Sequence, residues 1–294
     1  MGNRSQMVVL MTALHLWPLS ALAWGTQGHR MIGALAEDRL TPAAQAEVRK
    51  LLGNEDLAAA STWADEMRGS SDNPAFWSSY AANWHYVNIP AGSTYATSPR
   101  NPRGDALLAL ATFSAILTDE PIPAGGVQDG LRLYFPRFDP HAAEVKRFAL
   151  RFLLHILGDL QQPLHTGHVD DRGGNAIEFR WQGRNTNLHA LWDSALLGYT
   201  NIDEAAYVRR LRARLDHIPA SDLRNYEAAD VSTWLQEASR MLERIYSRLP
   251  NESTDAKAYA AEFVPTVELQ LLKGGVRTAW FLNNIFGGWP VGAP

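Results

Sequence analysis

Two copies of one four-residue spacing constrain this chain more than any other feature of its sequence. His155 and Asp159 form one His-x3-Asp pair, and His189 and Asp193 form a second. Residues four positions apart lie one above the other on an α-helix, so each pair presents an imidazole nitrogen and a carboxylate to one point. Such a pair suits a metal ion or a simple hydrogen bond inside the core, and one pair alone leaves both interpretations open.

The setting of the first pair favours the metal interpretation. Residues 148–157 are apolar on all sides, which predicts a buried helix where an unpaired carboxylate would be costly. Pro163 ends this helix and His165 follows it, so His165 and the two His-x3-Asp pairs, five candidate ligands, lie within 39 residues. The 294-residue chain has no cysteine, so a metal would need His, carboxylate and main-chain ligands. These ligands favour zinc and leave manganese and iron open.

The N-terminal residues 1–23 have the pattern of a secretory signal peptide. Arg4 precedes an apolar stretch from Met7 to Leu16, and an Ala-Leu-Ala cleavage sequence ends at Ala23. The apolar stretch is shorter than the roughly 20 residues of a membrane span, so we expect no membrane anchor after cleavage. The mature domain would be residues 24–294, beginning at Trp24.

A new N-terminus at Trp24 would itself be a candidate ligand. An α-amino group has a pKa of about 7.7 to 8.0, so it gives up its proton to a metal at modest cost. Its carbonyl oxygen and the imidazole of His29 lie close along the chain.

The rest of the pattern predicts a single, mainly α domain. The composition, 46% hydrophobic and 20% charged, is that of a globular protein with a real core. Thr41-Pro42 resembles a helix N-cap followed by proline at the first helical position. Residues 69–103 predict a loop with an extended piece at Trp84–Ile89, and Ala176–Trp181 predicts a hairpin strand. Helices are expected at 42–52, 55–67, 104–118, 140–161, 188–198, 203–216, 227–248 and about 256–284.

The charge balance excludes one class of partner. The chain has 27 Lys and Arg against 31 Asp and Glu, a net charge of −4, and loss of Arg4 would leave −5. No basic block is present, so strong non-specific binding to duplex nucleic acid is not expected.

Taken together, the motifs resemble those of the trinuclear-zinc nucleases. This family comprises fungal single-strand-specific nucleases, plant bifunctional nucleases and bacterial relatives, and shares a superfamily with bacterial zinc phospholipase C. The matching segments follow the family order: Trp24 with His29, Ser61–Arg68, Trp84-His85-Tyr86, His155–His165, Gly173-Gly174-Asn175 and Asn187–Asp193. The resemblance implies the mainly α fold of the zinc phospholipase C and single-strand nuclease type, with a short β-hairpin.

The resemblance also implies three Zn2+ sites. One would be held by Asp65, His85, His155 and Asp159. A second would use the Trp24 amine and carbonyl, His29 and a bridging Asp159. The third would use His165, His189 and Asp193. This leaves His141, His168 and His217 as ordinary surface or loop residues.

The implied reaction is hydrolysis of single-stranded DNA and RNA to 5′-phosphate products by a zinc-bound hydroxide, with 3′-mononucleotides as further substrates. The resemblance makes Asp65 a catalytic as well as a zinc-binding residue. It also implies that Arg68 contacts the transition-state phosphoryl group, that Asn175 contacts phosphate and that Tyr86 stacks on a nucleobase. Asn88 is a further catalytic candidate that departs from the family, because several members carry an aspartate there that can help orient the nucleophile or contact the nucleobase. Asparagine is a poor proton acceptor, so neither the nucleobase preference nor the pH optimum follows from the resemblance.

Two alternatives stay open on the sequence alone. One is a phospholipase C-type phosphodiesterase on the same zinc core, against which Asp193 and Gly173-Gly174-Asn175 argue by resemblance. The other is a non-catalytic zinc-binding protein. The absence of cysteine suits a bacterial member, since fungal and plant relatives usually carry disulfides. With the predicted signal peptide, we expect a secreted or periplasmic protein, and we also expect a monomer.

Overall fold

The computed structural model describes residues 24–90, 92–228, 230–251 and 253–287. The predicted signal peptide, residues 1–23, lies outside them. Helices dominate the described residues, and the strands they contain are β1 (Glu178–Trp181) and β2 (Arg184–Asn187), an antiparallel pair. The mainly α class with a short hairpin is confirmed.

The N-terminal half of the chain supplies most of the elements that surround the site. Its α-helices are α1 (Thr26–Glu37), α2 (Pro42–Leu52), α3 (Leu57–Ala60), α4 (Trp63–Met67), α5 (Pro74–Ser79), α6 (Ala106–Thr118), α7 (Gly126–Tyr134) and α8 (Ala143–Asp159). Three 3-10 turns join them: η1 (Ala81–His85), η2 (Tyr95–Thr97) and η3 (Pro163–Thr166).

The C-terminal half is built of longer helices after one short irregular segment. That segment contains α9 (Leu188–Ala190), the π-helical turn η4 (Leu191–Ala195) and α10 (Leu196–Tyr199). The later helices are α11 (Glu204–Leu215), α12 (Ala220–Ala228), α13 (Val231–Tyr246) and α14 (Ala256–Gly287).

Local sequence signals explain where several helices begin. The Thr41 hydroxyl accepts a hydrogen bond from the Ala44 amide at the start of α2, as the N-cap pattern predicts. One carboxylate oxygen of Asp105 accepts from two amides at the start of α6. No described helix combines the length and apolar character that a membrane span requires.

The structure corrects several predicted boundaries. The predicted helix 55–67 is two short helices, α3 and α4, and the predicted loop 69–103 contains α5 and two 3-10 turns. Trp84–Ile89 is not wholly extended, because Trp84 and His85 end η1. Beyond them, Val87 and Ile89 donate backbone hydrogen bonds to the carbonyls of His165 and Gly167. Helices α1 and α7 were not predicted, and α12 was only partly overlapped by the prediction.

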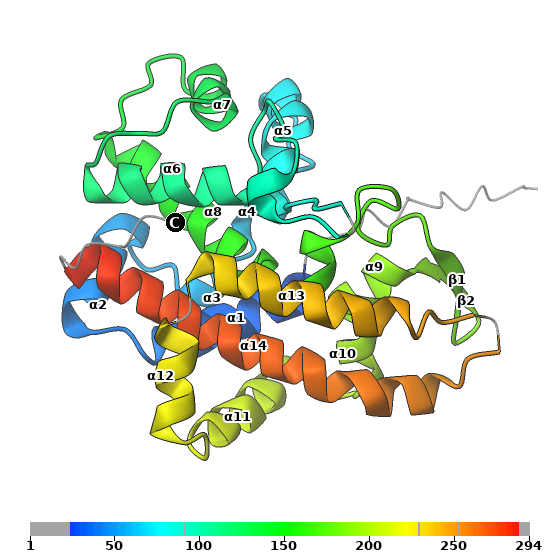
Figure 1. Ribbon diagram of the computed structural model, residues 1–294. Helices are drawn as coiled ribbons and strands as arrows, with labels where there is room; N and C mark the ends of the chain where they lie inside the picture. The colour runs from blue at the N-terminus through cyan, green and yellow to red at the C-terminus, as the bar shows by residue number, and fades with distance from the viewer. Residues whose placement is uncertain (1–23, 91, 229, 252, 288–294) are drawn as a thin grey trace, which may run out of the picture.

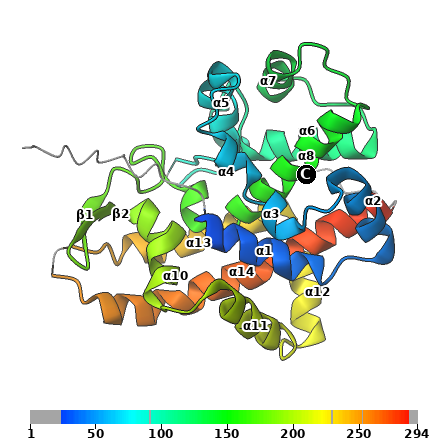
Figure 2. The ribbon, with the colours of Figure 1, turned by 180° about the vertical axis from the view of Figure 1, so that it is seen from behind.

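Two hydrophobic clusters meet where the site residues lie. The first surrounds α6 and α8 and includes Trp77, Trp84, Phe113 and Phe152. The second joins α1, α11 and α14 around residues such as Trp192. Figures 1 and 2 show α13 in front of α14 and α1 behind it, and α1 and α14 are in contact. Helix α8 contacts both α1 and α6, so its C-terminal end lies at the junction of the two clusters.

Candidate metal centre

Eight buried or nearly buried side chains converge at this junction from seven different elements. They form three groups in which the potential ligand atoms all lie within 4.8 Å of one another. The groups are His29, Asp65 and His155; His85, His155 and Asp159; and His165, His189 and Asp193. Each predicted metal-binding His or Asp side chain therefore falls in at least one group.

Asp159 links the first two groups. Its side chain is fully buried at the end of α8. Oδ1 lies 3.2 Å from Nε2 of His29, while Oδ2 lies 3.2 Å from both Nδ1 of His85 and Nε2 of His155. Asp65 completes the cluster, with Oδ1 3.7 Å from Nε2 of His155. The two oxygens of Asp159 thus face different histidines, which is the arrangement a bridging carboxylate needs.

Backbone carbonyls fix the orientation of three of the imidazole rings. In each of the three, Nδ1 of the ring lies 2.7 Å from a backbone carbonyl oxygen. The pairs are His155 with Ser61, His165 with His85, and His189 with Gly173. A carbonyl oxygen only accepts hydrogen bonds, so Nδ1 must carry the proton and Nε2 holds a lone pair. This second-sphere contact is typical of metal-binding histidines.

Of these three Nε2 nitrogens, those of His155 and His165 have no hydrogen-bond partner. Buried polar atoms are nearly always paired, so a concentration of unpaired ones needs an explanation. The unpaired buried nitrogens here include both ring nitrogens of His29 and Nε2 of His85, His155 and His165. The unpaired oxygens include Oδ1 of Asp159 and Oδ2 of Asp193. This donor set, of imidazole nitrogen and carboxylate oxygen, fits zinc ions.

The electrostatics of the protein alone point the same way. Burial lowers the pKa of His85 to about 4, and burial together with the charge of His165 lowers that of His189 to about 3. Burial opposes charge on His155 too, but Asp159 and Asp65 raise its pKa to about 9. Burial raises the pKa of Asp193 well above its usual range. His85 and His189 are therefore held as neutral imidazoles, while His155 is stabilised as a cation by the aspartates beside it. A metal ion bound there would replace the additional proton of His155 and allow Asp193 to ionise.

The third group rests on an irregular piece of backbone. His189 Nε2 lies 3.4 Å from Asp193 Oδ2, and Asp193 lies in the π-helical turn η4. The other oxygen, Oδ1, accepts a 2.5 Å hydrogen bond from Nε2 of Gln162. Gln162 is fully buried, and its own Oε1 accepts from the Leu164 amide at 2.6 Å.

Gln162 is a site residue that the sequence reasoning missed. The available signal was its position between Asp159 and His165, in a segment expected to be buried and therefore poor in unpaired polar groups. Its amide orients Asp193 so that Oδ2 remains for a metal.

Trp24 is buried next to this group. Its side chain is fully buried, and the amide of Gly25 donates a 2.8 Å hydrogen bond to the carbonyl of Asp193. The beginning of α1 is thereby fixed against η4. The role of the Trp24 amine and carbonyl as ligands stays a prediction.

The four predicted substrate residues lie around the cluster in different ways. Nη1 of Arg68 lies 3.3 Å from Oδ1 of Asp65, so the positive charge of Arg68 lies beside the candidate metal ligands. Tyr86 is partly buried and its hydroxyl donates to Oδ1 of Asn83 at 3.2 Å. Asn88 is partly buried on the extended segment that follows. Asn175 donates from Nδ2 to the Arg172 carbonyl at 2.8 Å. Their roles toward substrate stay predictions.

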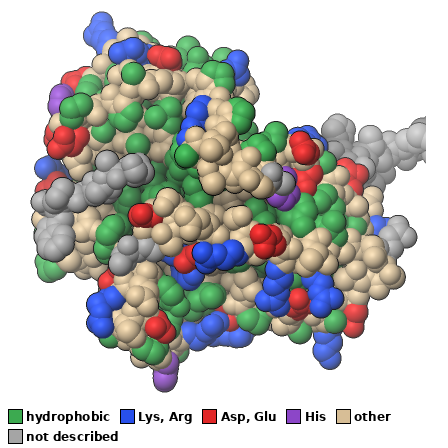
Figure 3. All heavy atoms as spheres, viewed as in Figure 1, with side chains coloured by type: hydrophobic (Ala, Val, Ile, Leu, Met, Phe, Trp, Pro, Cys, Tyr) green, Lys and Arg blue, Asp and Glu red, His purple; other side chains and the backbone are tan. Residues whose placement is uncertain are grey.

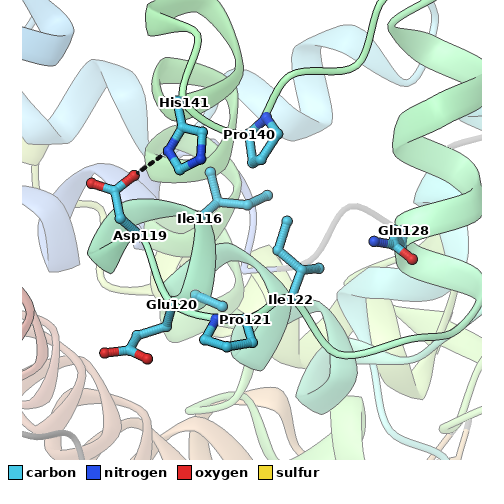
Figure 4. A pocket seen from close by; sticks show the side chains of 9 residues that line it. Ile116, Asp119, Glu120, Pro121, Ile122, Gln128, Pro140 and His141 are labelled. Atoms are coloured by element: carbon cyan, nitrogen blue, oxygen red, sulfur yellow. Dashed lines mark hydrogen bonds and ion pairs between the residues drawn. The ribbon is translucent and has the colours of Figure 1, made fainter.

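A separate cavity of about 390 Å³ lies near the end of α6 and contains none of these residues. Figure 4 shows Asp119 beside His141, with Nδ1 of the histidine 2.7 Å from the carboxylate. Lys146 is the third member of this ion-pair cluster. Both Asp119 and His141 are largely exposed, so the cluster has the character of a surface ion pair.

Comparison with known proteins agrees with this geometry. The model of the S1/P1 nuclease family matches residues 24–287. The chain belongs to the S1/P1 nuclease family. It is similar to endonuclease 4 of Arabidopsis thaliana, with 30% identity over 92% of this chain and 91% of the plant protein.

Two further relatives also match most of both chains, with lower identity. Endonuclease 2 of Arabidopsis thaliana is 27% identical over 98% of this chain and all of the plant protein. Nuclease P1 of Penicillium citrinum is 25% identical over 90% of this chain and 98% of the fungal protein. Family membership confirms the resemblance and the assignment of this chain as an enzyme that hydrolyses phosphodiesters.

Proposed function

We propose that this protein is a secreted or periplasmic enzyme that cleaves single-stranded DNA and RNA to 5′-phosphate products and also accepts 3′-mononucleotides. The convergence of eight His and Asp side chains, with unpaired ring nitrogens and carboxylate oxygens in buried surroundings, is the observation that carries the proposal. Family membership adds the reaction class.

Three zinc ions account for the donor atoms. Asp65, His85, His155 and Asp159 would hold one, and His165, His189 and Asp193 would hold another. The third would be held by His29, the second oxygen of Asp159 and the main chain of Trp24. When bound, zinc supplies a water of lowered pKa as the nucleophile and neutralises negative charge on the phosphoryl group.

The protein's own groups position the phosphodiester. Arg68 is about one-third exposed, and its guanidinium lies at the edge of the cluster beside Asp65. A guanidinium there can bind a phosphoryl oxygen and stabilise the charge that develops as the bond breaks. Asn175 supplies a side-chain amide from the turn that also carries Gly173, the backbone partner of His189.

Preference for single strands follows from Tyr86. Its ring is partly exposed directly after His85, and its backbone carbonyl accepts from Ala106 at the start of α6. A base that stacks on this ring must be unpaired, because paired bases lie inside the duplex stack. Stacking also tolerates any base.

The test is hydrolysis of matched substrates by protein that begins at Trp24. We expect cleavage of a single-stranded oligonucleotide, little cleavage of the same sequence as a duplex, and 5′-phosphate ends on the products. Chelation should abolish the activity and added zinc should restore it. Cleavage of phosphatidylcholine without cleavage of single-stranded DNA would overturn the proposed substrate, and failure to hydrolyse either would overturn catalysis.

A further inference from the structure

One segment of this acidic protein carries no acidic residue. Residues 73–104 contain neither Asp nor Glu, although the chain has 31 of them. The segment includes the ligand candidate His85 and three tyrosines, and it ends with Arg100 and Arg103. By contrast, acidic and basic side chains are intermixed on the face formed by α13 and α14 (Figure 3).

The two arginines lie on what we call the arginine loop, residues 98–104, which is attached firmly to the site. Trp84 donates from Nε1 to the Arg103 carbonyl at 2.9 Å, and Trp84 precedes His85. On the other side, Gly126 at the start of α7 packs so closely on the backbone of Pro102 and Arg103 that a Cβ there would clash. The loop therefore has a fixed position relative to His85.

Hydrogen bonds connect the arginine loop to the proposed base platform. The Tyr86 hydroxyl donates to Oδ1 of Asn83 at 3.2 Å, and Nδ2 of Asn101 donates to the same oxygen at 2.9 Å. The Asn101 side chain also accepts from the Arg103 amide at 2.9 Å. The exposed surface from Tyr86 to the arginine loop is thus one continuous hydrogen-bonded unit.

The guanidinium groups contact aromatic rings rather than carboxylates, and Arg103 also donates from Nη1 to the Ser79 carbonyl at 3.2 Å. Arg100 lies 3.2 Å from the ring centroid of Tyr95, and Arg103 lies 5.7 Å from that of Tyr80. Neither has a carboxylate within 4.0 Å in the described part of the chain, whereas Arg212, for example, is paired with Asp38. Stacking fixes the guanidinium planes and leaves N–H donors for an anion.

We propose that the arginine loop binds backbone phosphates of a single strand beyond the nucleotide that stacks on Tyr86. This inference rests on the proposed function and extends it, because it makes a long strand a better substrate than a dinucleotide. A basic surface next to an aromatic platform is the combination with which proteins follow single-stranded nucleic acid.

The test compares Arg100→Gln/Arg103→Gln with a matched control, Arg209→Gln/Arg224→Gln. The control changes two exposed arginines on α11 and α12, at the other end of the molecule from α5 and α6 (Figure 1). For each zinc-loaded protein, kcat and KM are measured on a single strand of about 20 nucleotides and on a dinucleotide. The NaCl concentration is varied over a roughly tenfold range, from about 0.05 to about 0.5 M.

Each phosphate contact on a single strand contributes about 0.7 to the slope of log affinity against log salt. Loss of two contacts should flatten the slope by about 1.4 and lower the ratio of kcat/KM for long strand to dinucleotide by about 25-fold at 0.1 M salt, mainly through KM. The control should match the wild type. Arg100→Gln alone, which leaves the hydrogen bonds of the described part of the loop in place, should give about half the change in slope.

The possible failures can be told apart. If the wild type cleaves no single strand, the proposed function is wrong, and the inference falls with it. If the wild type cleaves it but the loop variant has the same substrate ratio and salt slope as the control, only the arginine loop proposal is overturned. The melting temperatures of all three variants show whether a loss of activity comes from unfolding. If the double loop variant is unfolded, the salt slope of Arg100→Gln alone tests the proposal.

Discussion

Replacing Gln162 with methionine should selectively weaken the metal group of His165, His189 and Asp193. The side chain is fully buried, and it makes two hydrogen bonds, a 2.5 Å bond to Asp193 and a 2.6 Å bond from the Leu164 amide. Methionine has a similar size and makes neither. A carboxylate oxygen and a backbone N–H are then left unpaired in the core, at a cost of about 1–3 kcal/mol each, or about 2–6 kcal/mol together.

The variant should also bind the metal more weakly, because Asp193 loses the contact that orients it. Loss of such a second-sphere partner typically lowers metal affinity by about 10- to 100-fold. The assay is titration of the metal-free protein with zinc against a chromophoric chelator. We expect two zinc ions to bind as in the wild type and a third to bind about 10- to 100-fold more weakly.

The neighbouring Gln161 supplies a matched control. It is also fully buried, but its Oε1 accepts from Nη1 of Arg277 at 2.7 Å instead of contacting a ligand candidate. Gln161→Met should therefore lower the melting temperature and leave the zinc titration unchanged. If both variants titrate alike, Gln162 does not orient Asp193 and the reasoning is refuted.

Other perturbations address the remaining parts of the site. Asp159→Asn should remove two of three zinc ions and lower hydrolysis by at least about 100-fold, because its two oxygens face different histidines; metal analysis that still finds three would contradict the bridging role. Arg68→Ala should leave the zinc content unchanged and lower kcat by about 100-fold, and equal kcat would assign Arg68 to the surface. Retaining one extra residue before Trp24 should weaken the zinc held with His29, since an amide replaces the amine; an unchanged titration would exclude the amine as a ligand. Gly33→Ala should destabilise the fold by about 1–3 kcal/mol, because its Cβ would clash with the Leu57 backbone, and an unchanged urea midpoint would count against that packing.

Five of the eight clustered side chains were predictable from the residues because their chemistry is local in sequence, whereas Asp65 and His85 were assigned only by the family resemblance. The His-x3-Asp spacing, proline after the helix and an apolar helix around His155 each carry a physical signal that survives without tertiary information. The predicted buried helix is α8, in which His155 and Asp159 are fully buried. The second pair, His189 and Asp193, was also indicated by its spacing, but the π-helical turn that carries Asp193 is not indicated by α-helical periodicity.

Helix α1 shows why other elements escaped prediction. It contains Gly28 and Gly33, which lower intrinsic helix propensity. The structure shows the compensation, because Gly33 lets α1 approach the backbone of Leu57 at the start of α3. Such a gain appears only when two segments meet. Likewise, Gln162 has no role until Asp193, 31 positions later, folds against it.

The segment 69–103 misled prediction for a different reason. Its glycine, serine, asparagine and proline content is typical of loops, yet α5 and η1 form there because aromatic residues such as Phe76 and Trp77 pack into the core around α8. Tertiary burial of two large rings outweighs weak local propensity.

The metal content of protein that begins at Trp24, measured by mass spectrometry together with cleavage of single-stranded DNA before and after chelation, tests the central claim most directly. We predict close to three zinc ions per chain, with cleavage that disappears on chelation and returns with zinc. Fewer than two metal ions per chain, or cleavage indifferent to the chelator, would mean that the buried His and Asp cluster is a hydrogen-bonded core and not a catalytic metal centre.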